Sequence, residues 1–295
     1  MIAMSVDIGA AASFMATHAR LLDRRRFEFL FGGDAGAVLA AVDGYRNSDG
    51  GYGWGLEPDL RAAESQPGGA LHALEVFAEV GPTPRAVEVC DWLAGVTLPD
   101  GGVPFAVPVA DPAGCAPFWV KADPHSSSLQ STAFVAGVAH RVAARDPQVA
   151  AHPWLAAATR YCFDAIAALD DAPHAIALRF AVGFLDAVYD THAEAASLLE
   201  RLGAFVPADG LVPVAGGSEG ETMRPLDFAP LPGRPVRQLF SAEVIAADLR
   251  RVADSQQEDG GWVVDFANYS PAAALEWRGY VTVGTLSMLR ANGVV

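Results

Sequence analysis

A short acidic turn recurs along this chain at nearly regular intervals. Asp-Gly-Gly occurs at residues 49–51, 100–102 and 259–261, and a weaker Asp-Gly-Leu copy occurs at residues 209–211. The intervals between the aspartates are 51, 109 and 50 residues, so the long interval corresponds to two periods with one copy missing. The nearest candidate for that copy is the acidic segment 169–173. A repeat of this length is typical of folds in which each repeat forms one supersecondary unit.

Helical patterning fills the intervals between the turns. Apolar residues recur there at three- and four-residue spacings in segments rich in Ala and Leu, as in amphipathic helices. The predicted helices cover residues 69–80, 129–144, 154–169, 174–189, 193–205, 242–253 and 280–290. A short strand is predicted over residues 103–107. Six prolines exclude a continuous helix over residues 205–236, because proline removes a backbone donor and clashes with the preceding turn.

Each repeat is therefore expected to be a pair of helices joined at a turn. Such a pair cannot bury both apolar faces alone, so neighbouring pairs must stack. We expect the stack to close into an all-α double ring, an α/α toroid of about five to six helix hairpins, as a single domain over residues 1–295. An open helical solenoid is the alternative. The long insertions 104–124 and 205–236 are expected at the rim of the ring, where they could act as lids.

The charge balance limits the partners of this chain. It has 20 Lys and Arg residues against 35 Asp and Glu residues, which gives a formal net charge of −15. Nucleic acid is excluded as a partner, because phosphate backbones are bound by clustered cations and residues 24–26 form the only dense basic run. Three scattered cysteines indicate a reducing compartment rather than a disulfide framework or a Cys-x-x-Cys metal site.

The N-terminal residues lack the pattern of a signal peptide. No basic region precedes the apolar stretch, and Asp7 interrupts it, so we predict a cytoplasmic location. No run of about 18 consecutive apolar residues occurs, so no transmembrane segment is predicted. Peripheral contact with a membrane surface stays open, because it depends on how side chains gather on the folded surface.

The last turn carries the most specific motif. Residues 256–262 read QQEDGGW, which matches the Q-x(2–5)-G-x-W repeat motif of squalene-hopene and oxidosqualene cyclases. The layout of the repeats resembles the α/α-toroid family that these terpenoid cyclases share with protein prenyltransferase β subunits. Residues 45–61 and 276–290 are also similar to bacterial prenyltransferase/squalene-oxidase repeat proteins. The resemblance implies a single toroid whose central cavity binds an isoprenoid-type hydrophobic small molecule.

Catalytic motifs of that family are incomplete in this chain. Cyclases that protonate an alkene carry D-x-D-D-T-A at the start of an inner helix, and the corresponding residues 128–133 read SLQSTA. The magnesium motif D-D-x-x-D lacks its third acid at residues 170–174. The zinc-binding Asp-x-Cys of protein prenyltransferases is replaced by Asp-Pro-His at residues 123–125. We therefore expect no metal and no cofactor.

Three polar clusters lie next to predicted helices and supply the candidate site residues. The candidate proton donors are Asp59, Asp123 and Glu276. The residues expected to contact a substrate are Trp54, Glu57, Arg61, His125, Gln130, Trp277 and Arg278. Structural roles are the alternative: helix capping at the first two clusters, and a Glu276–Arg278 pair that supports the last repeat. His72 falls in an apolar helix, where a hydrogen-bonded core residue is the more common role.

Three functions are compatible with these residues. The first is a terpenoid-cyclase-like activity on an isoprenoid, with proton-initiated cyclisation or isomerisation. The second is a non-catalytic toroid that binds a hydrophobic ligand. The third is a carbohydrate-active α/α-barrel enzyme that uses Glu57 and Asp59 as paired carboxylates beside Tyr52 and Trp54. The sequence does not specify the chain length of the substrate or the oligomeric state.

Overall fold

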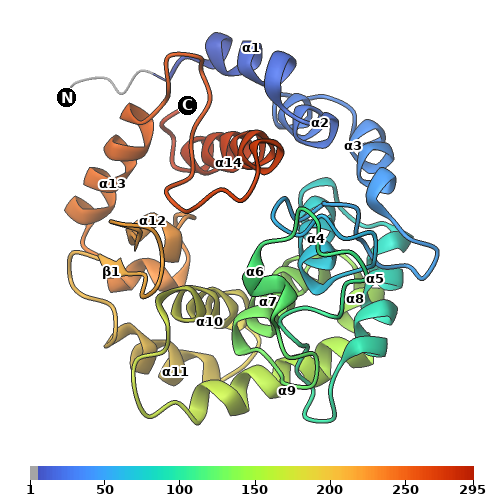
Figure 1. Cartoon of the computed structure of the whole chain (residues 1–295). Coiled ribbons are helices and arrows are strands. Elements are labelled where there is room, and N and C mark those ends of the chain that lie inside the picture. Colours follow the sequence, from blue (N-terminus) through green and yellow to red (C-terminus); the bar gives the residue numbers. More distant parts are fainter. Residues whose placement is uncertain (1–5) are drawn as a thin grey trace. The chain divides into compact units, whose positions relative to one another are not determined.

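The computed structural model describes residues 6–295 of the chain (Figure 1). This part is mostly helical, and its only strands form one short antiparallel pair, which confirms the all-α class. The chain divides into two compact units. The central unit is the continuous stretch Val42–Phe205, and the terminal unit combines the residues up to Ala41 with Val206–Val295.

In the central unit a helix rich in small residues contacts helices on several sides. α7 packs against α4, α9 and α10, while α5 packs on α4 and α11 packs on α10 (Figure 1). A Cβ on Gly137 of α7 would lie 3.3 Å from the Cα of Phe184 in α10, so the missing side chain allows the two helices to approach closely. The elements of this unit are η1 (Asp43–Tyr45), α4 (Pro67–Val80), α5 (Pro84–Val96), α6 (Pro117–Val120), α7 (Leu129–Ala143), α8 (Pro147–Ala150), α9 (Pro153–Ala167), α10 (Ala175–Val188) and α11 (Glu194–Gly203).

The terminal unit joins the two ends of the chain. Its longest helix, α14, contacts the N-terminal helices α1 and α2 and also α13, and α12 packs on α13. The strands pair Val212 with Met223 and Pro213 with Thr222. The elements are α1 (Ile8–His18), α2 (Leu21–Leu30), α3 (Ala35–Val42), β1 (Val212–Pro213), β2 (Thr222–Met223), α12 (Pro225–Phe228), η2 (Pro235–Leu239), α13 (Ala242–Asp254) and α14 (Pro271–Ala291).

The three Asp-Gly-Gly turns share one backbone geometry. In each turn the aspartate carboxylate accepts a hydrogen bond from the backbone N–H two residues later, at 2.9, 3.1 and 3.1 Å. The backbone of the middle glycine has a positive φ, of 86° at Gly50, 92° at Gly101 and 92° at Gly260. The weaker copy keeps the same bond, from Leu211 N–H to Asp209, at 3.0 Å. The sequence repeat is therefore a structural repeat, because only glycine adopts this conformation without strain.

The seven predicted helices are present, and the differences concern one strand, the start of the last helix and one turn. The strand expected at residues 103–107 is wrong: this segment forms only an isolated bridge, from Pro104 to Ser127. The last helix begins at Pro271 rather than at residue 280, because Ser270 caps it and proline suits its first turn. The segment 169–173, the candidate for the missing copy of the turn, leads into α10. It contains no glycine and so lacks the positive φ of the other turns. Residues 205–236 are broken into short elements, as their prolines predict.

The apolar spacing does not predict helices α1, α2, α3 and α5, nor the four-residue helices α6, α8 and α12. α2 is an example, because it reads LLDRRRFEFL and its arginines and acids obscure an apolar stripe. Within the described range no helix is both long and apolar enough to cross a bilayer.

Candidate functional site

The predicted site residues divide between the two units. The central unit contains Trp54, Glu57, Asp59, Arg61, Asp123, His125 and Gln130. The terminal unit contains Glu276, Trp277 and Arg278, all of them inside α14 rather than before it. Each group is therefore described within its own unit.

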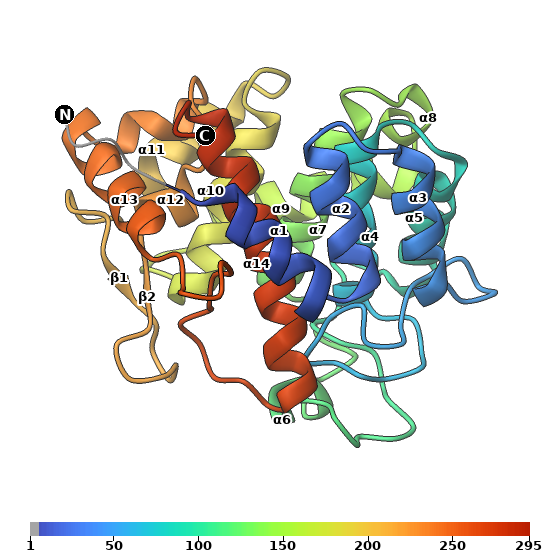
Figure 2. The same ribbon diagram turned by 90° about the horizontal axis from the view of Figure 1, so that it is seen from above.

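Two loops of the central unit meet at the ends of α4 and α7. The backbone N–H of Ala116 donates to the carbonyl of Asp59 at 2.8 Å. The amide side chain of Gln66 both donates to the carbonyl of Val107, at 3.1 Å, and accepts from its N–H, at 3.0 Å. Figure 2 shows both loops at the same end of this unit. These contacts place residues 46–66 against residues 97–128, although 41 residues separate Gln66 from Val107.

A buried histidine on α4 connects two carboxylates. The Nε2 atom of His72 lies 2.8 Å from Oε2 of Glu57, and its Nδ1 atom lies 2.8 Å from Oε2 of Glu75. The side chains of all three residues are at most 12 % exposed. Both ring nitrogens face acceptors, so the imidazole donates from both and carries a positive charge. The three residues together have a net charge of −1.

The pKa of His72 agrees with this arrangement. Burial acts to lower it, because a charged imidazole loses its hydration. The hydrogen bonds to Glu57 and Glu75 and the charges of these two residues outweigh burial, and they raise the pKa to about 9. His72 is therefore a hydrogen-bonded core residue, as its position in an apolar helix predicts.

Asp59 lies next to this cluster. It is 3 % exposed, and its backbone N–H donates to Oε1 of Glu57 at 3.2 Å. A Cβ on Gly68 would lie 3.4 Å from Cγ of Glu57 and 3.7 Å from Cη2 of Trp119, so the glycine leaves room for both side chains at the start of α4. The structure thus brings Glu57 and Asp59 together with an aromatic residue of the other loop.

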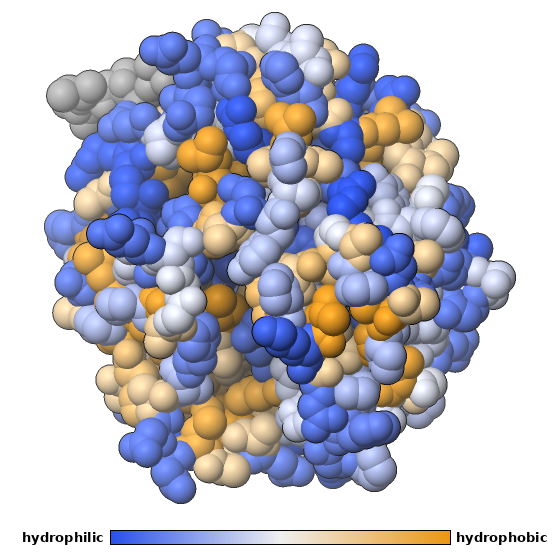
Figure 3. Space-filling view, viewed as in Figure 1, coloured by the Kyte–Doolittle hydropathy of each residue, from blue (hydrophilic) through white to orange (hydrophobic). Residues whose placement is uncertain are grey.

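Aromatic side chains gather around Trp119. The ring of Phe105 stacks on Trp119 with 4.4 Å between centroids, and Phe118 meets Phe105 edge-on at 6.3 Å. Phe118 is 44 % exposed, and Figure 3 shows apolar residues on the face over α6. The indole Nε1 of Trp119 is buried and has no hydrogen-bond partner among the described residues. A buried donor of this kind costs free energy unless an acceptor binds to it.

We name this arrangement the acid–aromatic site. It consists of Glu57, Asp59, His72, Glu75, Phe105, Phe118 and Trp119. Its chemistry combines buried negative charge, one buried carboxyl beside the ion cluster, and aromatic faces that can contact an apolar molecule.

The second candidate cluster has local roles. Asp123 is exposed, and its carboxylate accepts from the backbone N–H of His125 at 2.9 Å. Ser128 caps α7 by accepting from the N–H of Ser131 at 3.2 Å. Gln130 is half-buried in the first turn of α7. The contact of Ser128 fits the capping alternative, and the contact of Asp123 stays within its own loop.

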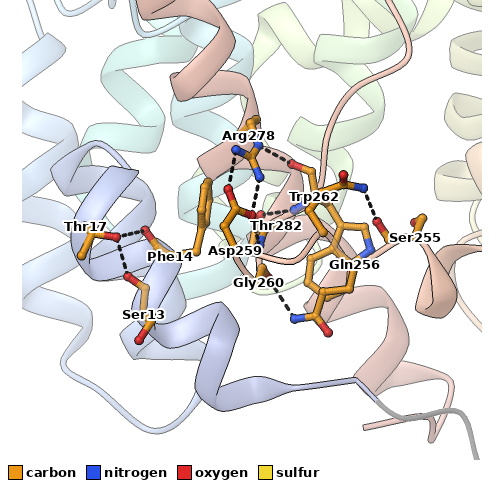
Figure 4. Close-up of polar contacts among 12 residues, drawn as sticks. Ser13, Phe14, Thr17, Ser255, Gln256, Asp259, Gly260, Trp262, Arg278 and Thr282 are labelled. Carbon is orange, nitrogen blue, oxygen red and sulfur yellow. Dashed lines mark hydrogen bonds and ion pairs between the residues drawn. The ribbon is translucent and has the colours of Figure 1, made fainter.

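The third candidate cluster lies at the closing turn of the terminal unit. The guanidinium of Arg278 forms two hydrogen bonds to the carboxylate of Asp259, at 2.8 and 2.7 Å (Figure 4). It also lies 4.5 Å from the ring centroid of Phe14. The hydrogen bond from Arg278 holds the pKa of Asp259 below its ordinary value. Arg278 thus connects the turn to α14 and α1, and Trp277 packs 5.4 Å from Tyr280.

The remaining predicted residues have exposed surfaces. Trp54 is 58 % exposed and lines a surface groove together with Trp92. Arg61 is exposed, and its side chain lies beside Gly114 in the facing loop.

Sequence reasoning missed Glu75 and gave no site role to His72. Their spacing of three residues on one helix was an available signal, because such pairs lie on the same face. The sequence did identify Glu57 as a candidate. Its contact with His72 was not predictable, because Glu57 lies in the loop before α4 and no helical spacing relates the two residues.

Within residues 6–295 no group of three or more His, Cys, Asp and Glu side chains has an arrangement that could hold a metal ion. No protein-family model and no curated protein matches this sequence.

Proposed function

We propose that this protein binds an isoprenoid-type hydrophobic molecule at the acid–aromatic site and promotes its proton-initiated cyclisation or isomerisation. The observation that supports this most directly is the buried Glu57–His72–Glu75 cluster beside stacked aromatic rings. A net negative charge and aromatic faces both stabilise a positive charge that develops on an apolar substrate. The resemblance to the terpenoid-cyclase family supports the same chemistry, and the closed helical ring remains a prediction of that resemblance.

Asp59 is the proton donor in this proposal. Its carboxyl transfers a proton to one carbon of a substrate C=C bond, whose π electrons form the new C–H bond and leave a carbocation at the other carbon. Attack by a second C=C bond closes a ring. Loss of a neighbouring C–H proton to the Asp59 carboxylate then restores a C=C bond and regenerates the acid. The product has the mass of the substrate.

The proposal is tested by native mass spectrometry with polyprenyl alcohols, polyprenyl diphosphates and quinone precursors, followed by product analysis. We expect binding and a mass-neutral product. Asp59→Asn should retain binding and lose the product. Asp123→Asn, the same change at an exposed position, should remain active and serves as the matched control.

Other outcomes separate the alternatives. Loss of product in Asp123→Asn or Glu276→Gln but not in Asp59→Asn would assign the proton donor to that other residue. Binding without any product would support a non-catalytic toroid. If no isoprenoid binds, the proposal fails and sugars are tested next. We rank the carbohydrate alternative lower, because the repeat motif at residues 256–262 resembles that of terpenoid cyclases.

A further inference from the structure

A surface groove of about 540 Å³ lies on the central unit beside the first Asp-Gly-Gly turn. This volume is in the range of small-molecule sites. Its lining combines aromatic, aliphatic, neutral polar and acidic residues, and it contains no Lys or Arg among the residues that the structure describes. Trp54 and Trp92 supply the aromatic surface, and Asp49 and Glu64 supply the charge.

Both indole rings are fixed by hydrogen bonds at their edges. Trp54 donates from Nε1 to Oδ1 of Asn47 at 2.8 Å, and Trp92 donates from Nε1 to Oδ2 of Asp49 at 3.1 Å. These bonds occupy the only polar atom of each ring. What the indoles offer to a ligand is therefore their π faces rather than a hydrogen-bond donor.

Trp54 has an unfavourable backbone conformation. Its φ is 57°, the only positive value at a non-glycine position in the described chain. The left-handed conformation costs roughly 1–2 kcal/mol for a residue with a Cβ. Its side chain is 58 % exposed, so core packing does not offset this cost. Strain of this kind is concentrated at functional sites.

The charge of the groove selects the class of ligand. Two carboxylates without a lining cation disfavour anions, and the chain as a whole has a net charge of −15. A cation over an indole face gains both the attraction of the ring and that of the carboxylates. We propose that this groove binds a small free alkylammonium cation, seated against the face of Trp54.

The test compares two probes of the same shape, choline and its neutral isostere 3,3-dimethylbutan-1-ol, in titrations followed by tryptophan fluorescence and calorimetry. We expect choline to bind at least about fivefold more tightly, which corresponds to the usual strength of a cation–π contact. Added salt should weaken choline binding, because Asp49 and Glu64 are close to solvent. Equal binding of both probes would overturn the proposal.

Variants locate the site. Trp54→Gly should reduce choline affinity at least tenfold without lowering the thermal midpoint, because glycine adopts positive φ without strain. Glu64→Gln should weaken binding several-fold, and Glu200→Gln, an exposed carboxylate on α11, should have no effect. Full binding by Trp54→Gly contradicts the assignment.

Two further arms separate this proposal from its alternatives. Phosphatidylcholine vesicles should not compete with free choline; if they do, the ligand is a lipid headgroup and the proposal of a free cation is wrong. Asp59→Asn should bind choline normally, and Trp54→Gly should still bind a polyprenyl substrate. The proposal for the groove and the proposal for the acid–aromatic site are therefore tested independently of each other.

Discussion

At the scale of single residues, His72 shows how a buried charge is stabilised. Its imidazolium gives up hydration and receives two carboxylates in return, one from its own helix and one from the preceding loop. Removing either partner would leave a buried charge without full compensation, which is costly. The same contacts fix Glu57 next to Asp59, so the ion cluster also positions the proposed proton donor.

The raised pKa of His72 predicts a pH-dependent stability. The pKa of His72 is about 9 in the folded state, against 6.5 for the ordinary side chain. The stabilisation of the folded state by the charged imidazole is therefore fully present below pH 6.5 and is lost as pH rises through 9. The free energy of unfolding should fall by about 3 kcal/mol over this interval. Denaturant unfolding between pH 6 and 10 measures it, with His72→Gln as the background. An imidazole signal of His72 that titrates near pH 6.5 would contradict the prediction.

Thr132 provides a second test at a single residue. Its hydroxyl accepts the buried N–H of Val103 at 3.0 Å and donates to the carbonyl of Ser128 at 2.7 Å. Thr132→Val keeps the shape and leaves that N–H without an acceptor, so unfolding should become easier by about 1–3 kcal/mol. Thr132→Ser keeps the hydroxyl and should lose less than half as much. Thermal and denaturant unfolding of the two variants decides, and equal losses would refute the role of the hydroxyl.

At the scale of elements, the repeated turn connects to the following helix in a consistent way. The aspartate of the first turn accepts from the hydroxyl of Ser65 at 2.8 Å, and that of the second accepts from Ser127 at 2.6 Å. In the last turn the aspartate, Asp259, accepts from the guanidinium of Arg278 instead of from a serine hydroxyl. After the second and the last Asp-Gly-Gly turns, the next residue donates its N–H to a buried threonine at 3.0 Å: Val103 to Thr132, and Trp262 to Thr282. The repeat thus includes side-chain contacts as well as the glycine conformation.

Alanine in equivalent turns should have graded effects. Gly50 and Gly260 both have positive φ, so each substitution costs roughly 1–2 kcal/mol from the backbone. A Cβ at Gly50 would lie 3.2 Å from Glu88 O, whereas a Cβ at Gly260 would lie 2.2 Å from the backbone of Ala10. Gly260→Ala must displace α1 and should lower the thermal midpoint much more than Gly50→Ala. Equal shifts of the two thermal midpoints in differential scanning calorimetry would show that the close approach of Ala10 to Gly260 does not affect stability.

At the scale of the whole molecule, contacts between distant parts of the sequence define the units. The side chain of Gln256 accepts from Asp7 N–H and donates to Asp7 O, both at 2.8 Å, across 249 residues of sequence. It also donates to Gly260 O at 2.9 Å. The indole of Trp262 donates to Val252 O at 2.8 Å. The closing turn therefore joins the first helix to the last part of the chain.

Two adjacent glutamines test this closure. Gln256→Ala removes the contacts to Asp7 and should lower the free energy of unfolding by about 1–2 kcal/mol. Gln257→Ala is the matched control, because its side chain donates only locally, to Ser255 O, and is exposed. It should change stability by less than about 0.5 kcal/mol. The measurement is denaturant unfolding, and similar effects of the two variants would argue against a role for Gln256 in joining the chain ends.

The sequence by itself determined the period of the repeat, the conformation of its turns and seven of the fourteen described α-helices, because these depend on glycine φ and on apolar spacing within a few residues. It also identified Glu57 and Asp59 as one polar cluster. Only the tertiary structure decided that His72 holds Glu57, that Phe105 stacks on Trp119 next to this cluster, and that residues 103–107 form no strand. It likewise decided that Gln256 binds the N-terminal helix. The physical reason is that these contacts join separate elements, and side-chain packing between elements is not encoded in the local pattern of either one.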